Sequence, residues 1–205
     1  MSGSGLSATD TGAPSRPRSE SQQSPVTDEA TLSLGSERAR ATWHVRAATG
    51  EDVPAVAAAV GELLRELGGP PPPGPAMEAA ARELVGDPHA GALFVADADG
   101  TREGPGTVGS NGPIVGVLAA SWQSAMHVPG RYALIQDLWV HHSWRSGGVG
   151  AGLLAALCEL TREQGLARVE VGLPGRGFSG LAATEAFYIA NGFTPLGARM
   201  RRGLV

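Results

Sequence analysis

The sequence predicts an α/β (α+β) domain in which helices cover a mixed sheet, and three observations support this. Apolar segments in the middle of the chain are joined by polar, glycine-rich stretches, which is typical of antiparallel hairpins. After about residue 140, strand-like segments alternate with helical ones, which is typical of crossover connections. The hydrophobic content is 42% in 205 residues, enough for one such domain with an appendage.

The appendage lies at the N-terminus. Residues 1–40 are rich in Ser, Gly, Thr, Glu, Gln and Arg and contain almost no large apolar side chains. Such a segment cannot bury enough surface to offset the entropy that it loses on ordering. We therefore expect a disordered tail over residues 1–40 and a folded domain over residues 41–205. A tail that orders on a partner is the alternative.

The folded domain is expected to begin with one strand and two helices. Residues 42–46 alternate as a short strand does. A variant of the capping box at residues 49–52, followed by apolar residues at helical spacing, predicts a helix over residues 53–67. Residues 68–75, rich in glycine and proline, end that helix and are not expected to be helical themselves. A second, shorter helix is expected over residues 76–85.

The remaining elements follow from apolar segments separated by turn residues. Further strands are expected over residues 92–96, 113–120, 132–140, 168–171 and 193–200, and further helices over residues 149–160 and 180–190. The long polar loop of residues 97–112 and a turn near residues 128–130 join the first three of these strands, which are therefore expected to pair as hairpins. The later strands are separated by helices and are expected to cross over the sheet.

Charge and cysteine content exclude several classes of protein. The formal net charge is -4, whereas a nucleic-acid-binding domain is usually strongly basic. The single cysteine, Cys158, cannot form an internal disulfide. No apolar run approaches the ~20 residues of a membrane span, and the N-terminus lacks the layout of a secretory signal. We therefore expect a cytoplasmic protein that binds neither nucleic acid nor a membrane. The scattered histidines predict no metal site.

The most informative segment is a glycine-rich loop between an expected strand and an expected helix. The strand ends at Val140, the helix begins near Val149, and the loop between them contains Arg145, Gly147 and Gly148. A helix N-terminus exposes unpaired N–H groups with a partial positive charge, and glycine lets the backbone approach an anion closely. A pyrophosphate is therefore the ligand to expect at this loop.

Two kinds of pyrophosphate site compete for this loop. Gly150, Gly152 and Ala155 fit the dinucleotide fingerprint, and Glu170 lies where its ribose-binding acid is expected. However, that fingerprint follows its strand by a very short turn and opens a βαβαβ half-domain. Here about seven residues separate the end of the strand from Gly148, and hairpin strands precede the loop. The order of the elements therefore disfavours a dinucleotide site.

A second pattern fits better. Arg145-x-x-Gly148-x-Gly150 resembles the acetyl-CoA pyrophosphate loop of the GNAT superfamily of N-acetyltransferases. Residues 185–193 (Glu-Ala-Phe-Tyr-x-x-Asn-Gly-Phe) resemble the second motif of that family, in the matching order. The resemblance covers about residue 42 to the C-terminus. It implies a GNAT-like mixed, mostly antiparallel sheet of about six to seven strands, flanked by four helices. The sheet would be splayed between the fourth and fifth strands, residues 132–140 and 168–171.

The resemblance also implies an activity. An acetyl group would pass from acetyl-CoA to the primary amine of a small molecule, by direct transfer in a ternary complex. Many relatives are homodimers, which makes a homodimer the oligomer to consider. The cosubstrate-binding residues that the resemblance implies are Leu138, Trp139, Val140, Arg145, Ser146, Gly147, Gly148, Val149, Gly150, Ala151 and Tyr188.

Several of these residues are implied to have defined roles. The Leu138 N–H would polarise the thioester carbonyl. Arg145 would reach a phosphate or else only shape the loop. Tyr188 would protonate the leaving thiolate or else only pack against the cosubstrate, with Phe187 pointing elsewhere on the helix. Asp137 is the first candidate for the base that deprotonates the amine; the alternative is a carboxylate that is solvated or satisfied within its strand.

Three other functions stay open at this point. They are a non-catalytic acyl-CoA sensor, a nucleotide- or NAD-binding module, and a protein-interaction module. The acceptor pocket of the family comes from the first helical region and from loops that face the cosubstrate. In this sequence those are roughly residues 63–77, 121–131 and 176–178. The identity of the amine does not follow from these segments.

Overall fold

The elements of the folded unit follow the predicted order. The structure, a computed structural model, describes residues 42–99, 107–109 and 112–197, all within one compact unit of residues 39–205. The tail predicted over residues 1–40 lies outside the described residues. The strands are β1 Trp43–Ala47, β2 Gly91–Ala98, β3 Thr107–Gly109, β4 Gly112–Ser124, β5 Arg131–Val140 and β6 Val169–Val171. The α-helices are α1 Val53–Glu66, α2 Gly74–Gly86, α3 Val149–Glu163 and α4 Leu181–Ala190.

The sheet is mixed and mostly antiparallel, as predicted. Its continuous path runs β1-β2-β4-β5-β6, and every neighbouring pair is antiparallel except β5 and β6, which are parallel. The short β3 pairs with the first residues of β4 and lies off this path. The four predicted helices are confirmed. The prediction of six to seven strands is too high for the five-strand path that the described residues form.

The missing strand is the one predicted over residues 193–200. Residues 193–197 form no strand, and residues 198–200 lie outside the described part of the chain. Pro195 has no N–H to give to a ladder, and Gly197 has a φ of 124°, which extended strands do not use. An apolar segment that contains these two residues therefore leaves helix α4 without joining the sheet.

Two further details differ from the prediction. Helix α2 begins at Gly74, so that Pro75 lies in its first turn, although residues 68–75 were expected to be wholly irregular. Proline is tolerated there because a first-turn N–H has no partner in the helix anyway. The loop predicted over residues 97–112 contains β3, whose hairpin with β4 was not expected.

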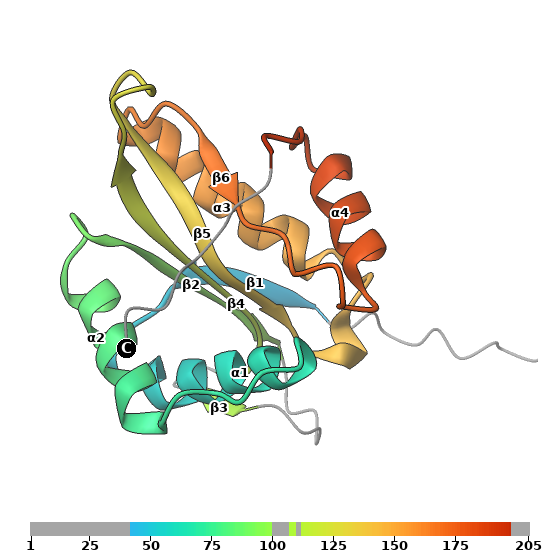
Figure 1. Cartoon of the computed structure of the whole chain (residues 1–205). Helices are drawn as coiled ribbons and strands as arrows, with labels where there is room; N and C mark the ends of the chain where they lie inside the picture. The colour runs from blue at the N-terminus through green and yellow to red at the C-terminus, as the bar shows by residue number, and fades with distance from the viewer. Residues whose placement is uncertain (1–41, 100–106, 110–111, 198–205) are drawn as a thin grey trace, which may run out of the picture. The chain divides into compact units, whose positions relative to one another are not determined.

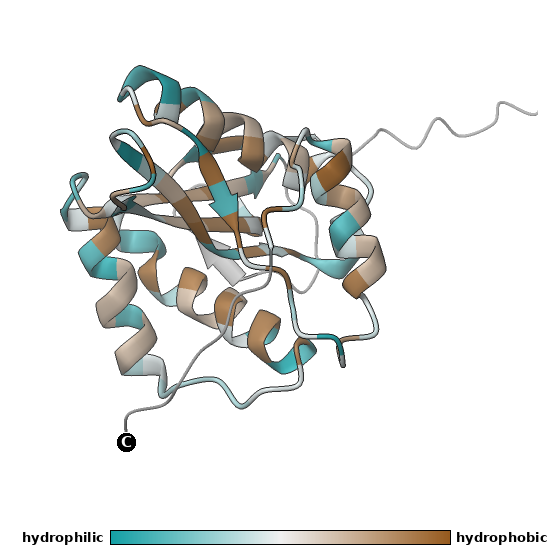
Figure 2. Cartoon of the chain, turned by 45° about the horizontal axis from the view of Figure 1, so that its top comes forward, coloured by the Kyte–Doolittle hydropathy of each residue, from teal (hydrophilic) through white to brown (hydrophobic). Residues whose placement is uncertain are grey.

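Helices cover both faces of the sheet (Figure 1). Helices α1 and α2 lie against one face, where Val53, Val56 and Val117 belong to one buried core cluster. Helices α3 and α4 lie on the other face, where Leu118 and Leu153 belong to a second cluster. The strands between them are largely hydrophobic, whereas each helix also carries hydrophilic residues (Figure 2). The sheet therefore separates two cores.

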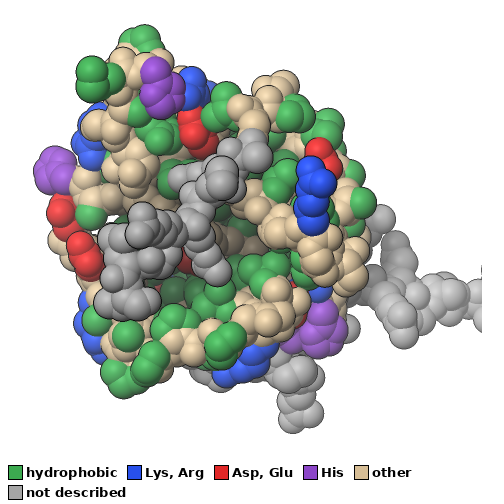
Figure 3. Space-filling model, in the orientation of Figure 1, with side chains coloured by type: hydrophobic (Ala, Val, Ile, Leu, Met, Phe, Trp, Pro, Cys, Tyr) green, Lys and Arg blue, Asp and Glu red, His purple; other side chains and the backbone are tan. Residues whose placement is uncertain are grey.

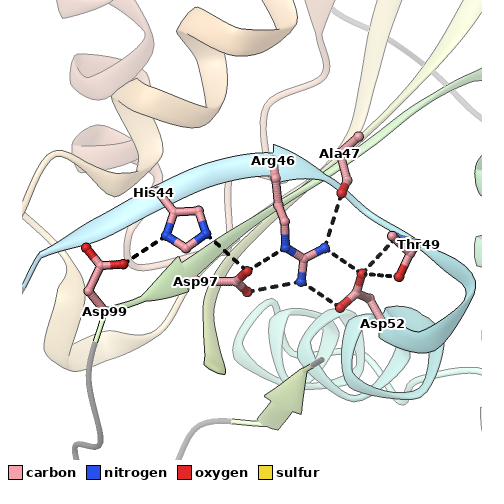
Figure 4. A network of polar contacts seen from close by, with 7 residues as sticks. All are labelled: His44, Arg46, Ala47, Thr49, Asp52, Asp97 and Asp99. Atoms are coloured by element: carbon pink, nitrogen blue, oxygen red, sulfur yellow. Dashed lines mark hydrogen bonds and ion pairs between the residues drawn. The ribbon is translucent and has the colours of Figure 1, made fainter. Parts of the chain in front are cut away.

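A buried ion-pair network joins β1, β2 and the start of α1 (Figure 4). Arg46 donates from Nε to Asp97 at 2.5 Å and from Nη1 and Nη2 to Asp52 at 2.7 and 2.8 Å. Both carboxylates are fully buried. Asp52 also accepts from the N–H of Thr49 at 2.7 Å, which confirms the predicted capping box. The network therefore holds the 3-10 turn Gly50–Asp52 that leads into α1.

Strands β5 and β6 separate beyond a short parallel pairing. They pair only over Ala133–Ile135 and Val169–Val171, and β5 then continues to Val140. At the point of separation β5 carries a bulge, because Ala119 of β4 pairs with Asp137 and Ala120 pairs with Ile135, which leaves Gln136 unpaired. A bulge bends its strand and increases the local twist. The predicted splay between these two strands is therefore present.

Candidate active site

The separation of β5 and β6 opens into a cleft of about 640 Å³. Its walls come from both faces of the sheet. Leu63, Glu66 and Leu67 of the α1 end line one side, and α4 lines the other through Phe187 and Tyr188. The space-filling view looks toward the hollow between α1, below, and α4, at the right (Figure 3). A ligand in this cleft would therefore contact elements from both faces of the sheet.

The edge of β5 presents backbone groups to this cleft. The N–H of His141 donates to Val115 of β4, so residues 139 and 137 also direct their backbone groups toward β4. The N–H of Ala133 instead donates to Arg168, on the side of β6. The bulge at Gln136 changes this alternation, so Leu138 and Val140 take the side of β6 after it. The Leu138 N–H therefore faces the cleft.

The glycine-rich loop ends at the N-terminus of α3. Gly148 is the N-cap, with a φ of 84°, and Ser146 has a φ of 63°, so both adopt the left-handed region. The first intrahelical bond runs from Gly152 N–H to Gly148 O at 2.9 Å. The N–H groups of Val149, Gly150 and Ala151 find no backbone acceptor in the described part of the chain. Three donors thus remain for an anion.

Two glycines in the first turn of α3 are needed for packing. A Cβ at Gly150 would lie 3.1 Å from Phe187 Cζ, and a Cβ at Gly152 would lie 2.5 Å from Trp43 Cη2. Trp43 also donates from Nε1 to the Gly147 carbonyl at 3.1 Å. The expectation that Phe187 points away from the site is wrong, because its ring lies against Gly150 and lines the cleft. The contact of Trp43 with the glycine loop was not predicted, because strand alternation alone does not show what a side chain contacts.

Arg145 is held by contacts within the protein. Its Nε donates to the Val140 carbonyl at 3.0 Å, and its Nη2 donates to both carboxylate oxygens of Glu66, at 2.7 and 2.6 Å. The pair is partly exposed, and both residues line the cleft. Glu66 lies 79 positions away in the chain, so sequence spacing offered no signal for this contact.

Tyr188 occupies the wall of the cleft on the side of α4. It is 7% exposed and packs edge-to-face against Phe187 and Phe193, with both ring centroids at 5.2 Å. Burial raises the pKa of its phenol to about 12. Its hydroxyl makes no hydrogen bond with any described residue. A phenol that stays protonated and unpartnered beside a cleft is suited to donate a proton or a hydrogen bond.

Asp137 lies on the opposite face of the sheet from Leu138. It pairs with Ala119, which belongs to the core under α1, whereas Leu138 packs with the core under α3. Burial raises the pKa of its carboxyl, and this carboxyl has no hydrogen-bond partner among the described residues. Asp137 is not among the residues that line the cleft, although Gln136 and Trp139, on either side, are. The strand thus brings Asp137 to the border of the cleft.

Trp139 carries a buried polar atom without a partner. Its Nε1 is the one buried side-chain nitrogen or oxygen in the described residues that lacks a hydrogen bond. Its ring meets His141 edge-on, with centroids 5.9 Å apart. Trp139 shares its face of β5 with Asp137 and lines the cleft. Of the cosubstrate residues predicted on this strand, it is therefore the one that faces α1 with its side chain.

The predicted site residues come together around one cleft. Those that line it are Leu138, Trp139, Val140, Arg145, Ser146, Gly148, Val149, Gly150, Ala151 and Tyr188. Gly147 stands beside them in the loop and accepts from Trp43. The cleft offers orphan N–H groups at one end, a free strand edge along its length and a phenol beside it. These features suit a long ligand with a phosphate end and an amide-bearing arm.

A mixed α/β fold with a splayed sheet and this loop is the arrangement that the resemblance to the GNAT superfamily implies. The sequence profile of the acetyltransferase (GNAT) family matches residues 61–193. This match covers more than half of the chain, so the protein belongs to the GNAT acetyltransferase family.

Solved structures share this fold. A possible acetyltransferase from Clostridium difficile 630 is 14% identical, with a TM-score of 0.63, over 80% of this chain and 97% of that one. The aminoglycoside N-acetyltransferase AAC(6')-Iy in complex with CoA is 16% identical, with a TM-score of 0.61, over 80% and 97%. An acetyltransferase from Trypanosoma brucei is 23% identical, with a TM-score of 0.55, over 80% and 100%. At these identities the likeness shows the fold alone.

No curated protein matches the sequence. Among the helices in the described part of the chain, not one has the length and apolar character needed to span a bilayer.

Proposed function

We propose that this protein transfers an acetyl group from acetyl-CoA to the primary amine of a small molecule, by direct transfer in a ternary complex. The observation that carries the proposal is the cleft between β5 and β6, whose walls come from both faces of the sheet. The glycine loop and Tyr188 lie on the side of α3 and α4, and Gln136 and Trp139 border it from the side of α1. Donor and acceptor would therefore meet at the strand edge.

The donor side fits acetyl-CoA. The N–H groups of Val149, Gly150 and Ala151 are free to hold a pyrophosphate, supported by Ser146, Gly147 and Gly148. The backbone groups of Leu138 and Val140 at the free edge of β5 can pair with amides of the pantetheine arm. Bound there, acetyl-CoA would supply an activated acetyl thioester. Arg145 Nη1 makes no hydrogen bond with any described residue, and this nitrogen is the one available to a phosphate.

Three groups of the chain would carry the transfer. Asp137 accepts a proton from the ammonium group, which then becomes the attacking amine. The raised pKa of Asp137 makes it a stronger base than an ordinary carboxylate. The Leu138 N–H donates to the carbonyl oxygen as negative charge develops there. Tyr188 gives a proton to the leaving sulfur as the C–S bond breaks; the second proton of the amine nitrogen leaves to solvent, from which Tyr188 is reprotonated, and its pKa of about 12 keeps it protonated at neutral pH.

The first experiment is isothermal titration of the protein with acetyl-CoA, together with two matched variants. Ala151→Glu places a negative charge in the first turn of α3, at a position that lines the cleft. A negative charge at a helix N-terminus is favourable, so the variant is expected to fold. Ala155→Glu places the same charge one turn later, on an exposed position outside the cleft. We expect micromolar binding by the wild type, a loss of at least about tenfold in Ala151→Glu, and no change in Ala155→Glu.

A second measurement separates an enzyme from a sensor. Release of free thiol from acetyl-CoA is followed with a panel of primary amines. Turnover that depends on the amine supports the transferase. Binding without turnover for any amine supports the acyl-CoA sensor instead. A folded wild-type protein that does not bind acetyl-CoA would overturn the proposal, and NAD would then be titrated.

A further inference from the structure

Polar side chains gather on the face of β4 and β5 that lies toward α1. Ser121 and Gln123 take this face, because the residues beside them, Ala120 and Trp122, belong to the core under α3. Gln136 reaches the same face, since its Nε2 donates to Ser121 Oγ at 2.7 Å. Asp137 follows Gln136 directly and takes this face too. The bulge thus sends two consecutive side chains to one side of the sheet.

Gln136 is held in place but keeps a free acceptor. Ser121 Oγ accepts from Gln136 Nε2 and also from Gln123 Nε2, the latter at 2.9 Å. Gln136 Oε1 makes no hydrogen bond with any described residue. Gln136 is exposed and lines the cleft, whereas Gln123 does not line it. The Gln136 carbonyl oxygen is therefore available to accept a hydrogen bond from a ligand in the cleft, next to Asp137 in the chain.

Two adjacent acceptors favour a particular kind of ligand. An ammonium that donates to Asp137 would bring its own neighbouring carbon atoms over Gln136. A hydroxyl or amino group on such a carbon would donate to Gln136 Oε1. A bare hydrocarbon there would displace the water that hydrogen-bonds to that oxygen without replacing the hydrogen bond, which is unfavourable. Sites built to bond a polar group reject analogues that lack it.

We propose that Gln136 is a specificity-determining residue that selects primary amines with a second hydrogen-bond donor on a carbon next to the amine-bearing one. The inference rests on the proposed acetyl transfer, because it assigns the acceptor to the face of β5 toward α1. The bulge positions Gln136, and Ser121 accepts a hydrogen bond from its amide nitrogen. The carbonyl oxygen is then available to accept a hydrogen bond from the second donor of the amine substrate.

The test compares two acceptors of nearly equal size, trans-2-aminocyclohexanol and cyclohexylamine. Wild-type protein is compared with Gln136→Leu, which keeps the bulk and removes the carbonyl. Gln123→Leu is the matched control, because it loses a bond to the same Ser121 but stands outside the cleft. We expect the wild type to favour the amino alcohol in kcat/KM by about tenfold. Gln136→Leu should abolish that preference through KM, whereas Gln123→Leu should keep it.

A binding measurement keeps the inference separate from the proposed function. Each amine is titrated calorimetrically into the protein saturated with CoA. If neither amine is acetylated but the amino alcohol binds more tightly, and only while Gln136 is present, acetyl transfer to these amines is contradicted, whereas the selection of the amine by Gln136 in binding stands. If both amines are acetylated equally well by wild type and Gln136→Leu, the transfer proposal stands and the inference falls. The inference also falls if neither amine is bound or acetylated.

Discussion

Arg145 and Glu66 join the glycine loop to the C-terminal turn of α1. Nη2 of the arginine lies 2.7 and 2.6 Å from the two carboxylate oxygens of the glutamate, and both residues line the cleft. The pair therefore connects the wall on the side of α1 with the loop proposed to hold the pyrophosphate. Because the pair is partly exposed, its effect on stability is expected to be small, below about 1 kcal/mol.

Glu66→Gln is expected to tighten acetyl-CoA binding a few-fold. The change removes a negative charge near the phosphate site and releases Nη2 of Arg145 for a phosphate. Calorimetric titration measures the effect, which should shrink as salt is added. Glu62→Gln, on the exposed surface of the same helix one turn earlier, is the control and should leave binding unchanged. Weaker binding in Glu66→Gln would mean that the pair positions Arg145 rather than competing for it.

Gly152→Ala is expected to destabilise the fold by ~1–3 kcal/mol. The new Cβ would lie 2.5 and 2.6 Å from ring atoms of Trp43, whose indole also bonds to the loop. Urea unfolding measures the change. Gly61→Ala in α1 is the control, because its Cβ would meet neighbours at an ordinary 3.6 Å and alanine favours a helix. Equal stability of Gly152→Ala and wild type would contradict the described packing of Trp43.

Arg46→Met is expected to destabilise the fold by ~3–5 kcal/mol at neutral pH. It leaves Asp52 and Asp97 buried without their cation (Figure 4). Hydrogen bonds from Arg46 hold the pKa of Asp52 well below its usual range. That stabilisation is present above the unfolded-state pKa and is lost as pH falls through the folded-state value.

The destabilisation by Arg46→Met should therefore shrink when urea unfolding is repeated at acid pH, where the orphaned Asp52 carboxylate takes up a proton. Arg82→Met is the matched control. It breaks an exposed ion pair with Glu78 within α2, which is worth no more than about 0.5 kcal/mol. A loss of stability in Arg46→Met no greater than in Arg82→Met would contradict the importance of the buried network.

Asp137→Asn is expected to stabilise the protein at neutral pH while lowering its activity. Burial raises the pKa of this carboxyl, so its neutral form is the one the fold favours. The penalty for ionised Asp137 is absent below the unfolded-state pKa and grows as pH rises through the interval up to the folded-state value. Urea unfolding should therefore show a gain at pH 7 that disappears near pH 3. An unchanged kcat would exclude Asp137 as the base.

Tyr188→Phe is expected to lower kcat by about 10- to 100-fold with little change in acetyl-CoA binding. It should also alter stability in alkali. The pKa of the phenol is about 10 in the unfolded chain and about 12 in the folded protein. The wild type therefore loses stability as pH rises between these values. The phenylalanine variant lacks that loss. Parallel unfolding curves for the two proteins across this pH range would contradict the burial of the phenol.

Local patterns predicted most of the elements but not all of their limits. The periodicity from Val53 onward and the capping box at residues 49–52 identified α1, since both features act within a few residues. Strand β3 was not predicted, and the described part of the strand predicted over residues 193–200, residues 193–197, forms no strand. Backbone pairing depends on what a distant segment offers, and Pro195 and Gly197 outweighed the apolar character of residues 193–197.

The sequence by itself determined the glycine loop, the two motifs and therefore the family, because these depend on short-range spacing and backbone freedom. Only the tertiary structure decided which groups surround the loop. It brought Glu66 to Arg145 and Trp43 to Gly152, and it turned Gln136 toward the cleft through a bulge. Contacts between residues far apart in the chain, and the register of paired strands, arise only when the two cores pack against the sheet.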